Sequence, residues 1–365
     1  MILGVAPGRL ATTVVAVRDG VPTSSWSVPA VPAMPALPAV PAVPPAPALP
    51  AMPAAAGTAL PRAQDTLECA LPDGLGLGAA GGPGEIRAAC VAMDLDSLPT
   101  APVAAIRVGA PCPPVLAPHV AHPRGAAVIV RGGHSLTGRP LAALDADAVR
   151  TFAAACGLVD FAVTATGSPV LADHELAVAD LVAAEVPGAR ITLSYEFGRP
   201  GLREREGEAI LNASLRPEAE RVADALAAWL PCIPVYFART GEGLVSAHYF
   251  RRYPLVCAAG ATAAAVRGGA GPGTPHQDAD RLRAAVAFGA TLADPMAGVE
   301  RIVQARGRAE LDRELGDARD EALTRVVSAG AVPGSARVGE MTVNPLSYLP
   351  DGLYRVRVTA TGTTP

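Results

Sequence analysis

The sequence predicts an α/β protein. Between Ala126 and Ala238, runs of β-branched and apolar residues alternate with longer segments whose apolar residues recur at helical spacing. Such an alternation favours a parallel sheet covered by helices, because parallel strands need a crossover connection between them. The last part of the chain adds a charged helical segment and two strand-like runs, which predict a helical and two-stranded C-terminal block.

The chain opens with the signal of a β-hairpin. Ile2–Val5 and Thr12–Val17 are β-branched runs with a Pro-Gly turn between them. A three-residue repeat of proline and alanine follows from Val28 to Ala54 and contains ten of the 37 prolines. Proline fixes φ near the polyproline II value, so the repeat predicts a stiff rod, interpreted as an insert without chemistry of its own. The next strand is expected at Ile86–Met93.

The regular region gives both strands and helices. Strands are expected at 126–131, 160–166, 191–195 and 233–238, and helices at 145–157, 173–186 and 201–230. Asp145 and Asp173 are candidate N-caps, and Pro187-Gly188 is a stop signal. The C-terminal block is expected to contain a helix at 278–293, a strand at 299–305, a charged helix at 308–329 and strands at 336–343 and 353–361.

Composition shifts divide the chain into five segments. The first is a hairpin, 1–27, and the second is the Pro/Ala-rich low-complexity insert, 28–57. The remainder of an N-terminal lobe, an α/β body and the C-terminal block are expected at 58–125, 126–277 and 278–365.

Composition also excludes several kinds of chemistry and partner. The 365 residues carry a formal net charge of −4, so there is no global positive field to attract nucleic acid. All thirty basic residues are arginine, which excludes a Walker lysine or a Schiff-base lysine. No apolar stretch reaches the length of a bilayer span without proline or charge, so we expect a cytoplasmic protein that does not contact membranes. The six cysteines form no CxxC pair and are expected to be reduced.

Several local motifs lack the context that their chemistry needs. Gly76-Leu-Gly78-Ala-Ala-Gly81 has the spacing of a dinucleotide fingerprint, but too few residues follow it for the helix that must bind the pyrophosphate. The glycine run 268–273 is followed by neither a lysine nor a Ser/Thr ligand for Mg²⁺, which is typical of a loop. His119 and His122 have no third ligand at helical spacing, so no metal site is expected there.

Two other segments carry candidate functional groups. The loop Arg131–Pro140 directly follows a predicted strand, and its His134 can act as an acid, a base or a hydrogen-bond donor, or can only stabilise the turn. Leu202–Glu206 opens a long helix, and Glu196 lies shortly before it. Acidic residues in a first helical turn are favoured by the helix dipole alone, so they need no catalytic explanation.

The run SYEFGRPGLREREGEAILNASLRP, Ser194–Pro217, resembles the hydantoinase A/oxoprolinase family, whose members carry Ser-x-Glu, a short loop, Arg-Glu and a helix beginning with Leu-Asn-Ala. The likeness covers most of Arg107 to Gly362. Other segments are similar to family segments in the same order: Arg107–Pro114, Arg131–Arg150, Thr240–Pro254, Ala264–Ala270 and the block from Ala284 through NPLSYLPDGLYRVRVTATG.

The resemblance implies an α/β fold of the ribonuclease-H/actin-like, two-lobed type, here truncated and carrying a polyproline II insert. It implies ATP-dependent hydrolysis of a small cyclic amide of the hydantoin or 5-oxoproline type, with ATP and Mg²⁺ as cofactors and a hydantoinase B-like subunit as partner. Phosphorylation of the ring amide oxygen would convert that oxygen into a leaving group. By resemblance and loop position, the catalytic candidates are His134, Glu196, Glu204, Arg205 and Asn212. The cofactor-binding candidates are Gly8, Thr12, Gly241, Gly243 and Gly268, and no metal ligand is assigned.

The chain departs from the family pattern at the phosphate loops. The first loop, expected as Asp-x-Gly-Gly-Thr-x-Thr-Asp, is matched by Ala6–Thr13, where both carboxylates are missing. A Gly-Thr-Thr-His segment falls on Asp94–Ser97, without the histidine, and the second acidic loop is absent after Ala264–Ala270. Phosphoryl transfer depends on Mg²⁺ held by carboxylates, so we expect impaired ATPase chemistry. The alternative is a non-catalytic scaffold or regulatory subunit that keeps the family's partner-binding surface.

Overall fold

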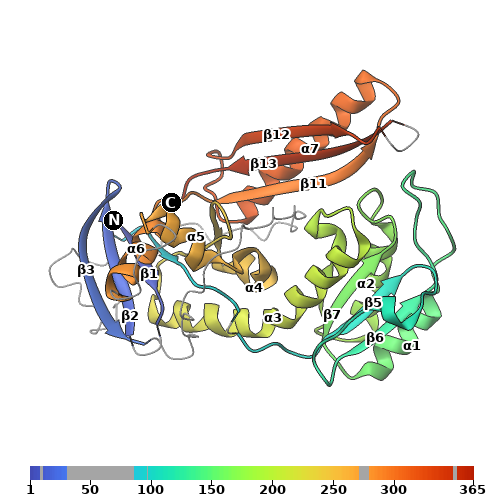
Figure 1. Cartoon of the computed structure of the whole chain (residues 1–365), viewed down its shortest axis with the longest axis horizontal. Coiled ribbons are helices and arrows are strands. Elements are labelled where there is room, and N and C mark those ends of the chain that lie inside the picture. The colour runs from blue at the N-terminus through green and yellow to red at the C-terminus, as the bar shows by residue number, and fades with distance from the viewer. Residues whose placement is uncertain (9–10, 31–85, 97, 271–278, 348–351) are drawn as a thin grey trace.

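The computed structural model describes residues 1–8, 11–30, 86–96, 98–270, 279–347 and 352–365. Three sheets organise these residues, and helices lie between and beside them (Figure 1). The α/β class predicted from the sequence is confirmed. Most of the expected repeat and the glycine pattern at 76–81 lie outside the described residues.

The first sheet has six strands in the order β10-β9-β4-β1-β2-β3. Strands β1, β4 and β9 run parallel to each other, and the other pairs are antiparallel. Their bounds are β1 Ile2–Ala6, β2 Ala11–Arg18, β3 Val21–Pro29, β4 Ala88–Val91, β9 Val235–Ala238 and β10 Leu244–Ser246. The predicted hairpin and the strand after it are therefore confirmed, whereas β9 joins this sheet rather than the sheet built by the strands at 126–195.

The predicted start of the Pro/Ala insert at residue 28 is corrected by strand β3, which extends to Pro29. Val28 and Pro29 end this strand and pair with Thr12 and Ala11. The signal for β3 is the dipeptide Asp19-Gly20, whose φ angles of 52° and 76° give the two-residue turn that hairpins favour. Four residues of the strand are Ser or Thr and most of its positions are exposed, so the apolar pattern does not reveal it.

The second sheet is fully parallel, with the order β6-β5-β7-β8. Its strands are β5 Ala104–Val108, β6 Ala126–Val130, β7 Asp160–Ala165 and β8 Arg190–Leu193. Helices α1 (Ala146–Cys156) and α2 (Asp173–Glu185) share a core with one face, and the first half of α3 (Leu202–Trp229) shares a core with the other. The predicted alternation of strand and helix is confirmed here. Strand β5 was not predicted, and the expected boundary at 125/126 falls between two neighbouring strands of this sheet.

Two predicted helix caps have different outcomes. The Asp145 side chain accepts the Ala148 N–H at 3.1 Å and caps α1, as expected. Asp173 is instead the first residue of α2, whose N-cap, Ala172, offers no side-chain acceptor.

The C-terminal sheet has the antiparallel order β11-β13-β12, and α7 (Arg308–Ser328) packs on it. Its strands are β11 Met296–Gln304, β12 Arg337–Pro345 and β13 Leu353–Thr361. Helices α4 (Ala247–Arg252), α5 (Gly260–Arg267) and α6 (Ala279–Thr291) complete the fold. The expected helices and strands of this block are confirmed, and the strand expected at 299–305 joins the two C-terminal strands in one sheet.

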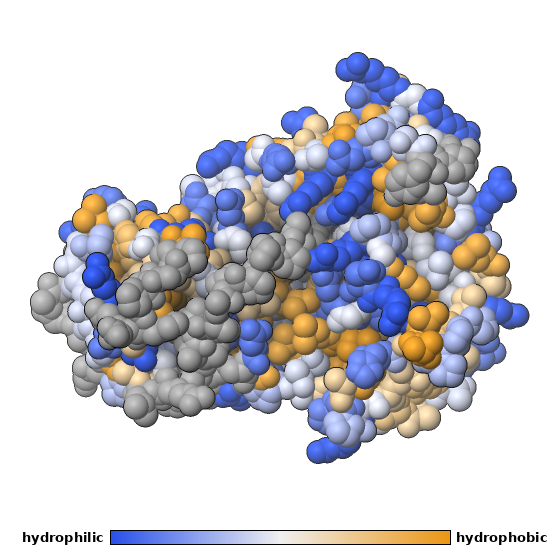
Figure 2. Space-filling model, viewed as in Figure 1, coloured by the Kyte–Doolittle hydropathy of each residue, from blue (hydrophilic) through white to orange (hydrophobic). Residues whose placement is uncertain are grey.

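Helix α3 connects the two larger sheets. Ala209 and Ala213 pack in the core of the four-stranded sheet, whereas Leu215, Val222 and Leu226 belong to the core shared with the six-stranded sheet and α7. Figure 2 shows hydrophilic residues along the boundary between the C-terminal sheet and the four-stranded sheet. A cleft lies at that boundary, lined by residues of the C-terminal sheet and α7 on one side and of the loop after β6 on the other.

The expectation that all six cysteines are reduced is wrong for one described cysteine. Cys232 is disulfide-bonded, whereas Cys90, Cys112, Cys156 and Cys257 are free. Among the described residues, no helix is both long enough and apolar enough to span a bilayer. A cytoplasmic location stays a prediction.

Candidate functional site

Residues expected to bind phosphate lie along one edge of the six-stranded sheet. Gly8 and Thr12 flank the turn after β1, Asp94 follows β4, and Gly241 and Gly243 follow β9. Because β1, β4 and β9 are parallel, their carboxyl ends meet at this edge, which is where ligands bind in open α/β sheets. The fold thus brings the two predicted groups of loop residues to one side of the sheet.

Helix α6 fills the space beside Gly8. A Cβ atom at Gly8 would overlap the Ala11 carbonyl oxygen and lie 3.3 Å from Nε of Arg283, which belongs to α6. Thr12 is fully buried, and its Oγ1 has no hydrogen-bond partner within the described part of the chain. Gly8 therefore permits close packing, and Thr12 presents an unsatisfied hydroxyl at this edge.

The three other glycines have packing or turn roles. Gly241 and Gly243 have φ angles of 80° and 89° in the β9–β10 turn, and the Gly241 carbonyl accepts a hydrogen bond from Arg267 at 2.7 Å. A Cβ atom at Gly268 would overlap the carbonyl oxygen of Ala285 on α6. Gly268 therefore faces a packed helix–helix contact.

Asp94 is a half-buried carboxylate at this edge, and its oxygens accept hydrogen bonds from α5. It accepts hydrogen bonds from the Ala261 N–H at 2.9 Å and from the Thr262 N–H and hydroxyl at 3.2 and 3.1 Å. Burial raises the pKa of Asp94. No group of three or more acidic, histidine or cysteine side chains in the described ranges could hold a metal. The described residues of this edge therefore do not supply the carboxylate set that a Mg²⁺–nucleotide requires, and we derive no chemical step through it.

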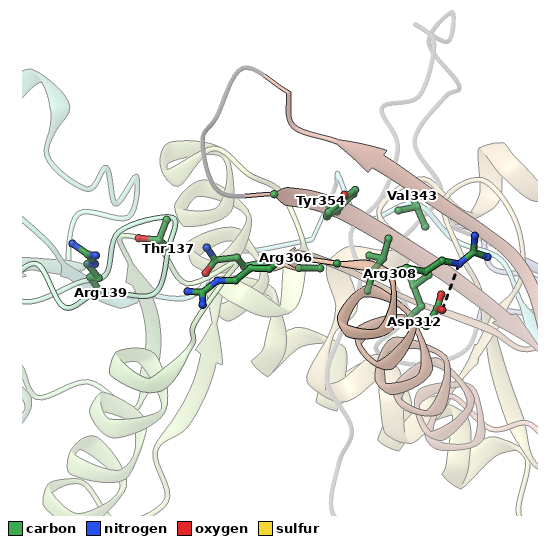
Figure 3. A pocket seen from close by; sticks show the side chains of 13 residues that line it. Thr137, Arg139, Arg306, Arg308, Asp312, Val343 and Tyr354 are labelled. Carbon is green, nitrogen blue, oxygen red and sulfur yellow. Dashed lines mark ion pairs between the residues drawn. The ribbon is translucent and has the colours of Figure 1, made fainter.

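A second edge, at the carboxyl ends of the four-stranded sheet, holds most of the predicted catalytic residues. The loop after β6 carries His134 and also Thr137 and Arg139, which line a cleft of about 1230 Å³. The opposite wall comes from the C-terminal sheet and the start of α7 (Figure 3). The cleft is lined by Thr137, Arg139, Gln304, Ala305, Arg306, Gly307, Arg308, Leu311, Asp312, Leu315, Val343, Gly352 and Tyr354.

His134 is a buried residue of this loop, and its ring contacts that of a second histidine. It is 4 % exposed, and its ring centroid is 4.2 Å from that of His174. His174 Nδ1 accepts the Gly133 N–H at 2.8 Å, so that nitrogen carries no proton. Burial and the neighbouring His134 lower the pKa of His174 and so favour its neutral form. His134 Nδ1 has no hydrogen-bond partner among the residues that the structure describes.

Glu175 ties the ends of two strands to α2. It is fully buried, and its Oε1 accepts hydrogen bonds from the Ala165 N–H at 2.8 Å and the Ser194 hydroxyl at 2.6 Å. Oε2 accepts the Tyr195 N–H at 3.0 Å. The carboxylate is thereby satisfied by groups at the ends of β7 and β8.

Arg205 completes this network from the first turn of α3. Its side chain is 1 % exposed, and burial lowers its pKa. The guanidinium donates to three backbone carbonyls and two hydroxyls at 2.9–3.3 Å: those of Arg199, Pro200, Ala165, Ser168 and Ser194. Arg205 therefore fixes the loop before α3 against the strand ends.

Glu196 is the most perturbed acid of the site. It lies in the short helix η5 (Ser194–Phe197) and is 2 % exposed. Burial raises its pKa to about 7, although Arg252 Nη2, 3.6 Å from Oε1, favours the charged form. Its Oε2 has no hydrogen-bond partner in the described ranges. A carboxyl with this pKa exchanges its proton near neutral pH, as a general acid or base must.

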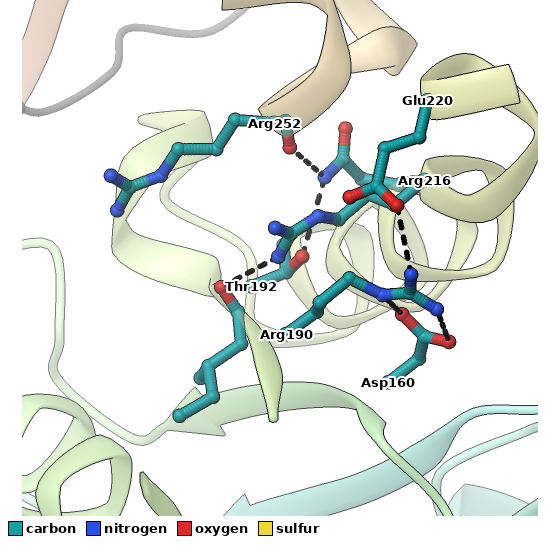
Figure 4. Close-up of polar contacts among 8 residues, drawn as sticks. Asp160, Arg190, Thr192, Arg216, Glu220 and Arg252 are labelled. Atoms are coloured by element: carbon teal, nitrogen blue, oxygen red, sulfur yellow. Dashed lines mark hydrogen bonds and ion pairs between the residues drawn. The ribbon is translucent and has the colours of Figure 1, made fainter. Parts of the chain in front are cut away.

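The other two catalytic candidates, Asn212 and Glu204, differ in burial: the first is buried and the second is exposed. Asn212 is fully buried and joins β8 to α4: its Nδ2 donates to Thr192 Oγ1 at 3.3 Å and to the Arg252 carbonyl at 3.1 Å (Figure 4). Its Oδ1 accepts the Leu255 N–H at 3.2 Å. Glu204 is exposed, and its carboxylate folds back over Gly201. The structure does not bring Glu204 into the buried network.

Two ion pairs with buried carboxylates were not predicted from the sequence. Arg107, on β5, forms a bidentate pair with Glu206 on α3. Arg190 binds Asp160 through two hydrogen bonds of 2.7 Å and reaches Glu220 at 2.9 Å (Figure 4). An arginine inside an otherwise apolar strand, as in AAIRV at 104–108, is the signal that a buried carboxylate must face it.

No family model matches the chain, and neither does any curated protein. Among solved structures, it is similar to an ATP-dependent caprolactamase from Pseudomonas jessenii, with a TM-score of 0.67 and 10 % sequence identity. The alignment covers 100 % of this chain and 89 % of that chain. This chain has the fold of that caprolactamase.

A second solved structure supports the same assignment of fold. It is an acetone carboxylase in its nucleotide-free state, described as carrying out ATP-dependent acetone carboxylation. The TM-score is 0.50 and the identity 12 %, with coverage of 100 % of this chain and 48 % of that chain. The caprolactamase-like fold thus recurs in a much longer chain.

Proposed function

We propose that this protein is a hydantoinase/oxoprolinase-type subunit that acts on a small cyclic amide and whose ATPase chemistry is impaired. The match over the whole chain to an ATP-dependent caprolactamase carries the proposal. The ordered sequence resemblance from Arg107 to Gly362 supports it independently. Glu196 is the acid that we assign to proton exchange, because its pKa is raised to about 7 and its Oε2 has no hydrogen-bond partner in the described ranges.

The sheet topology supports the first lobe of a ribonuclease-H/actin-like fold. Three antiparallel strands, β3-β2-β1, continue into the parallel strands β4 and β9. The packing of α6 against Gly8 and the use of Asp94 as a helix cap support weakened handling of ATP and Mg²⁺. We also propose a hydantoinase B-like partner, and neither nucleic acid nor membrane as a partner, consistent with a net charge of −4.

The proposal is tested by supplying cyclic amides to the full chain, alone and with a hydantoinase B-like subunit. Hydantoin, 5-oxoproline and caprolactam are each incubated with ATP and Mg²⁺, and ring-opened product and released phosphate are measured together. We expect at least one cyclic amide to bind and to be opened slowly when the B-like subunit is present. Failure of all three amides to bind, with or without that subunit, would refute the proposal.

Variants of Glu196 separate its chemical role from folding. Glu196→Gln keeps the shape of the side chain but removes its titration, so product formation is expected to fall and to lose its pH dependence near pH 7. Asp317→Asn, an exposed change on α7, is the matched control and should leave turnover unchanged. Equal turnover in both variants would contradict a chemical role for Glu196.

A non-catalytic scaffold or regulatory subunit is the second candidate, and a specific observation favours it. Glu175, Arg205 and Asn212 direct their hydrogen bonds to groups of the protein itself. This role predicts a stable complex with the B-like subunit and no binding of ATP. Micromolar ATP affinity in calorimetry, together with turnover of a cyclic amide, would exclude it.

A further inference from the structure

The cleft between the loop after β6 and the start of α7 brings together side chains that are distant in sequence. Arg139 and Thr137 come from one wall, and Arg306 and Arg308 from the other (Figure 3). The two walls belong to different sheets. The cleft therefore exists only where the four-stranded sheet and the C-terminal sheet meet. A backbone hydrogen bond from the Ile302 N–H to the Pro169 carbonyl also joins these two parts of the chain.

Positive charge in this cleft exceeds what its own carboxylates can balance. Three guanidinium groups and one carboxylate, Asp312, line it. Asp312 lies 3.7 Å from Arg308, and both side chains are exposed, so this pair is weak. The guanidinium groups of Arg139 and Arg306 have no partner within the described ranges. Two arginines on opposite walls are thus left to bind an anion from solution.

The start of α7 adds to this positive field. Its N-cap, Gly307, has no side chain that could accept the free N–H groups of the first turn. The positive end of the helix dipole lies there, beside Arg306 and Arg308. Glu310, in the first turn, accepts the Arg306 N–H at 2.8 Å, so one carboxylate already lies at this end and the dipole adds to the arginines only in part.

An apolar wall lies beside the arginines. Leu311 and Leu315 of α7 and Val343 and Tyr354 of the C-terminal sheet line the same cleft. All four side chains are at least partly buried, so they offer a fixed surface. A ligand that satisfies both features has an anionic head group and an apolar or planar body.

We propose that this cleft binds a small organic phosphate, with the phosphate between Arg139 and Arg306 and the organic body against Tyr354. A phosphate monoester carries nearly two negative charges near neutral pH and three acceptor oxygens, which match the planar donor forks of facing arginines. This site is separate from the edge at Gly8 and Asp94, and the proposal does not depend on cyclic-amide hydrolysis.

Calorimetry of the full chain with four probes tests the ligand class. Phenyl phosphate is expected to bind more tightly than inorganic phosphate, because only the former has a ring for the apolar wall. It should also bind more tightly than benzoate, which has the same ring but a single charge. Pyrophosphate serves to compare added charge with added apolar surface. If phenyl phosphate shows no binding, or binds no more tightly than benzoate, the proposal is wrong.

Arginine variants locate the site. Arg306→Ala and Arg139→Ala are each expected to weaken phenyl phosphate binding about tenfold, because each removes a charge-assisted contact. Arg313→Ala removes an exposed arginine of α7 that does not line the cleft, and should change the affinity less than about twofold. Equal weakening by Arg313→Ala would show non-specific attraction and overturn the site, and unchanged binding in Arg139→Ala would place any bound phosphate outside the cleft.

The apolar wall has its own test. Tyr354→Leu keeps an apolar side chain and removes the ring, so the preference for phenyl phosphate over inorganic phosphate should shrink several-fold. The affinity for inorganic phosphate should stay the same. An unchanged preference would overturn the assignment of Tyr354 to the organic body of the ligand.

Discussion

Replacing Glu196 by glutamine should remove a large pH dependence from the stability of the protein. The carboxyl is 2 % exposed, and burial raises its pKa from 4.5 to about 7. The folded state therefore holds the proton more tightly than the unfolded state does. Its stabilising contribution is complete below pH 4.5, is lost progressively as the pH rises to about 7, and does not decline further above that.

The magnitude follows from the size of the shift. One pKa unit corresponds to about 1.36 kcal/mol, so the free energy of unfolding should fall by roughly 3 kcal/mol across this range because of Glu196 alone. In Glu196→Gln this loss does not occur. The difference in free energy of unfolding, variant minus wild type, should therefore rise by roughly 3 kcal/mol between acidic pH and pH 8.

Urea unfolding at pH 5, 6, 7 and 8, followed by circular dichroism, measures this difference. Contributions from the histidines and the other acids cancel, because both proteins share them. Asp317→Asn, an exposed carboxyl on α7, is the control and should give a difference that is flat with pH. A difference between Glu196→Gln and wild type that stays constant to within about 0.5 kcal/mol would refute the reasoning.

Four further substitutions test the packing, the buried network and the helix caps. Arg205→Lys loses the forked geometry that reaches several acceptors, and should lower the free energy of unfolding by about 3 kcal/mol in urea titration. Gly268→Ala would overlap the Ala285 carbonyl oxygen and should cost about 1–3 kcal/mol; an unchanged midpoint would show that α5 and α6 can separate freely. Asp145→Ala should cost about 1 kcal/mol in thermal unfolding, because α1 loses its cap, whereas Asp173→Ala should cost less, because Asp173 is not the N-cap.

Elements with strong local patterns were predictable from the sequence. Strand β7 and helices α1 and α2 have continuous apolar runs or helical spacing, and the structure places them within a few residues of the expected bounds. Strand β5 was missed because alanine has low strand propensity and prolines lie close on both sides. Its place in the sheet comes from tertiary contacts, since both of its neighbours are strands from later in the chain.

The candidate site was predictable only in part. His134, Glu196 and Arg205 do lie at the carboxyl ends of the parallel strands, as a position after a strand or before a helix suggests. Glu175 was not singled out, because an acid in the first turn of a helix is favoured by the helix dipole alone. Its contacts with Ser194 and Ala165 arise only when α2 folds back on the sheet.

Helix α3 couples this network to the six-stranded sheet. Its first turns hold Arg205 and Glu206 in the polar network of the four-stranded sheet, whereas Val222 and Leu226, further along the helix, pack in the other core. Pro217 lies inside α3 between these two groups of residues, and it has no backbone N–H to donate to the preceding turn. The helix can therefore bend at this position, because one of its backbone hydrogen bonds is missing there. A ligand that shifts the first turns of α3 would then act on the contacts of Arg205 and Glu206 before it acts on the core that holds Val222 and Leu226.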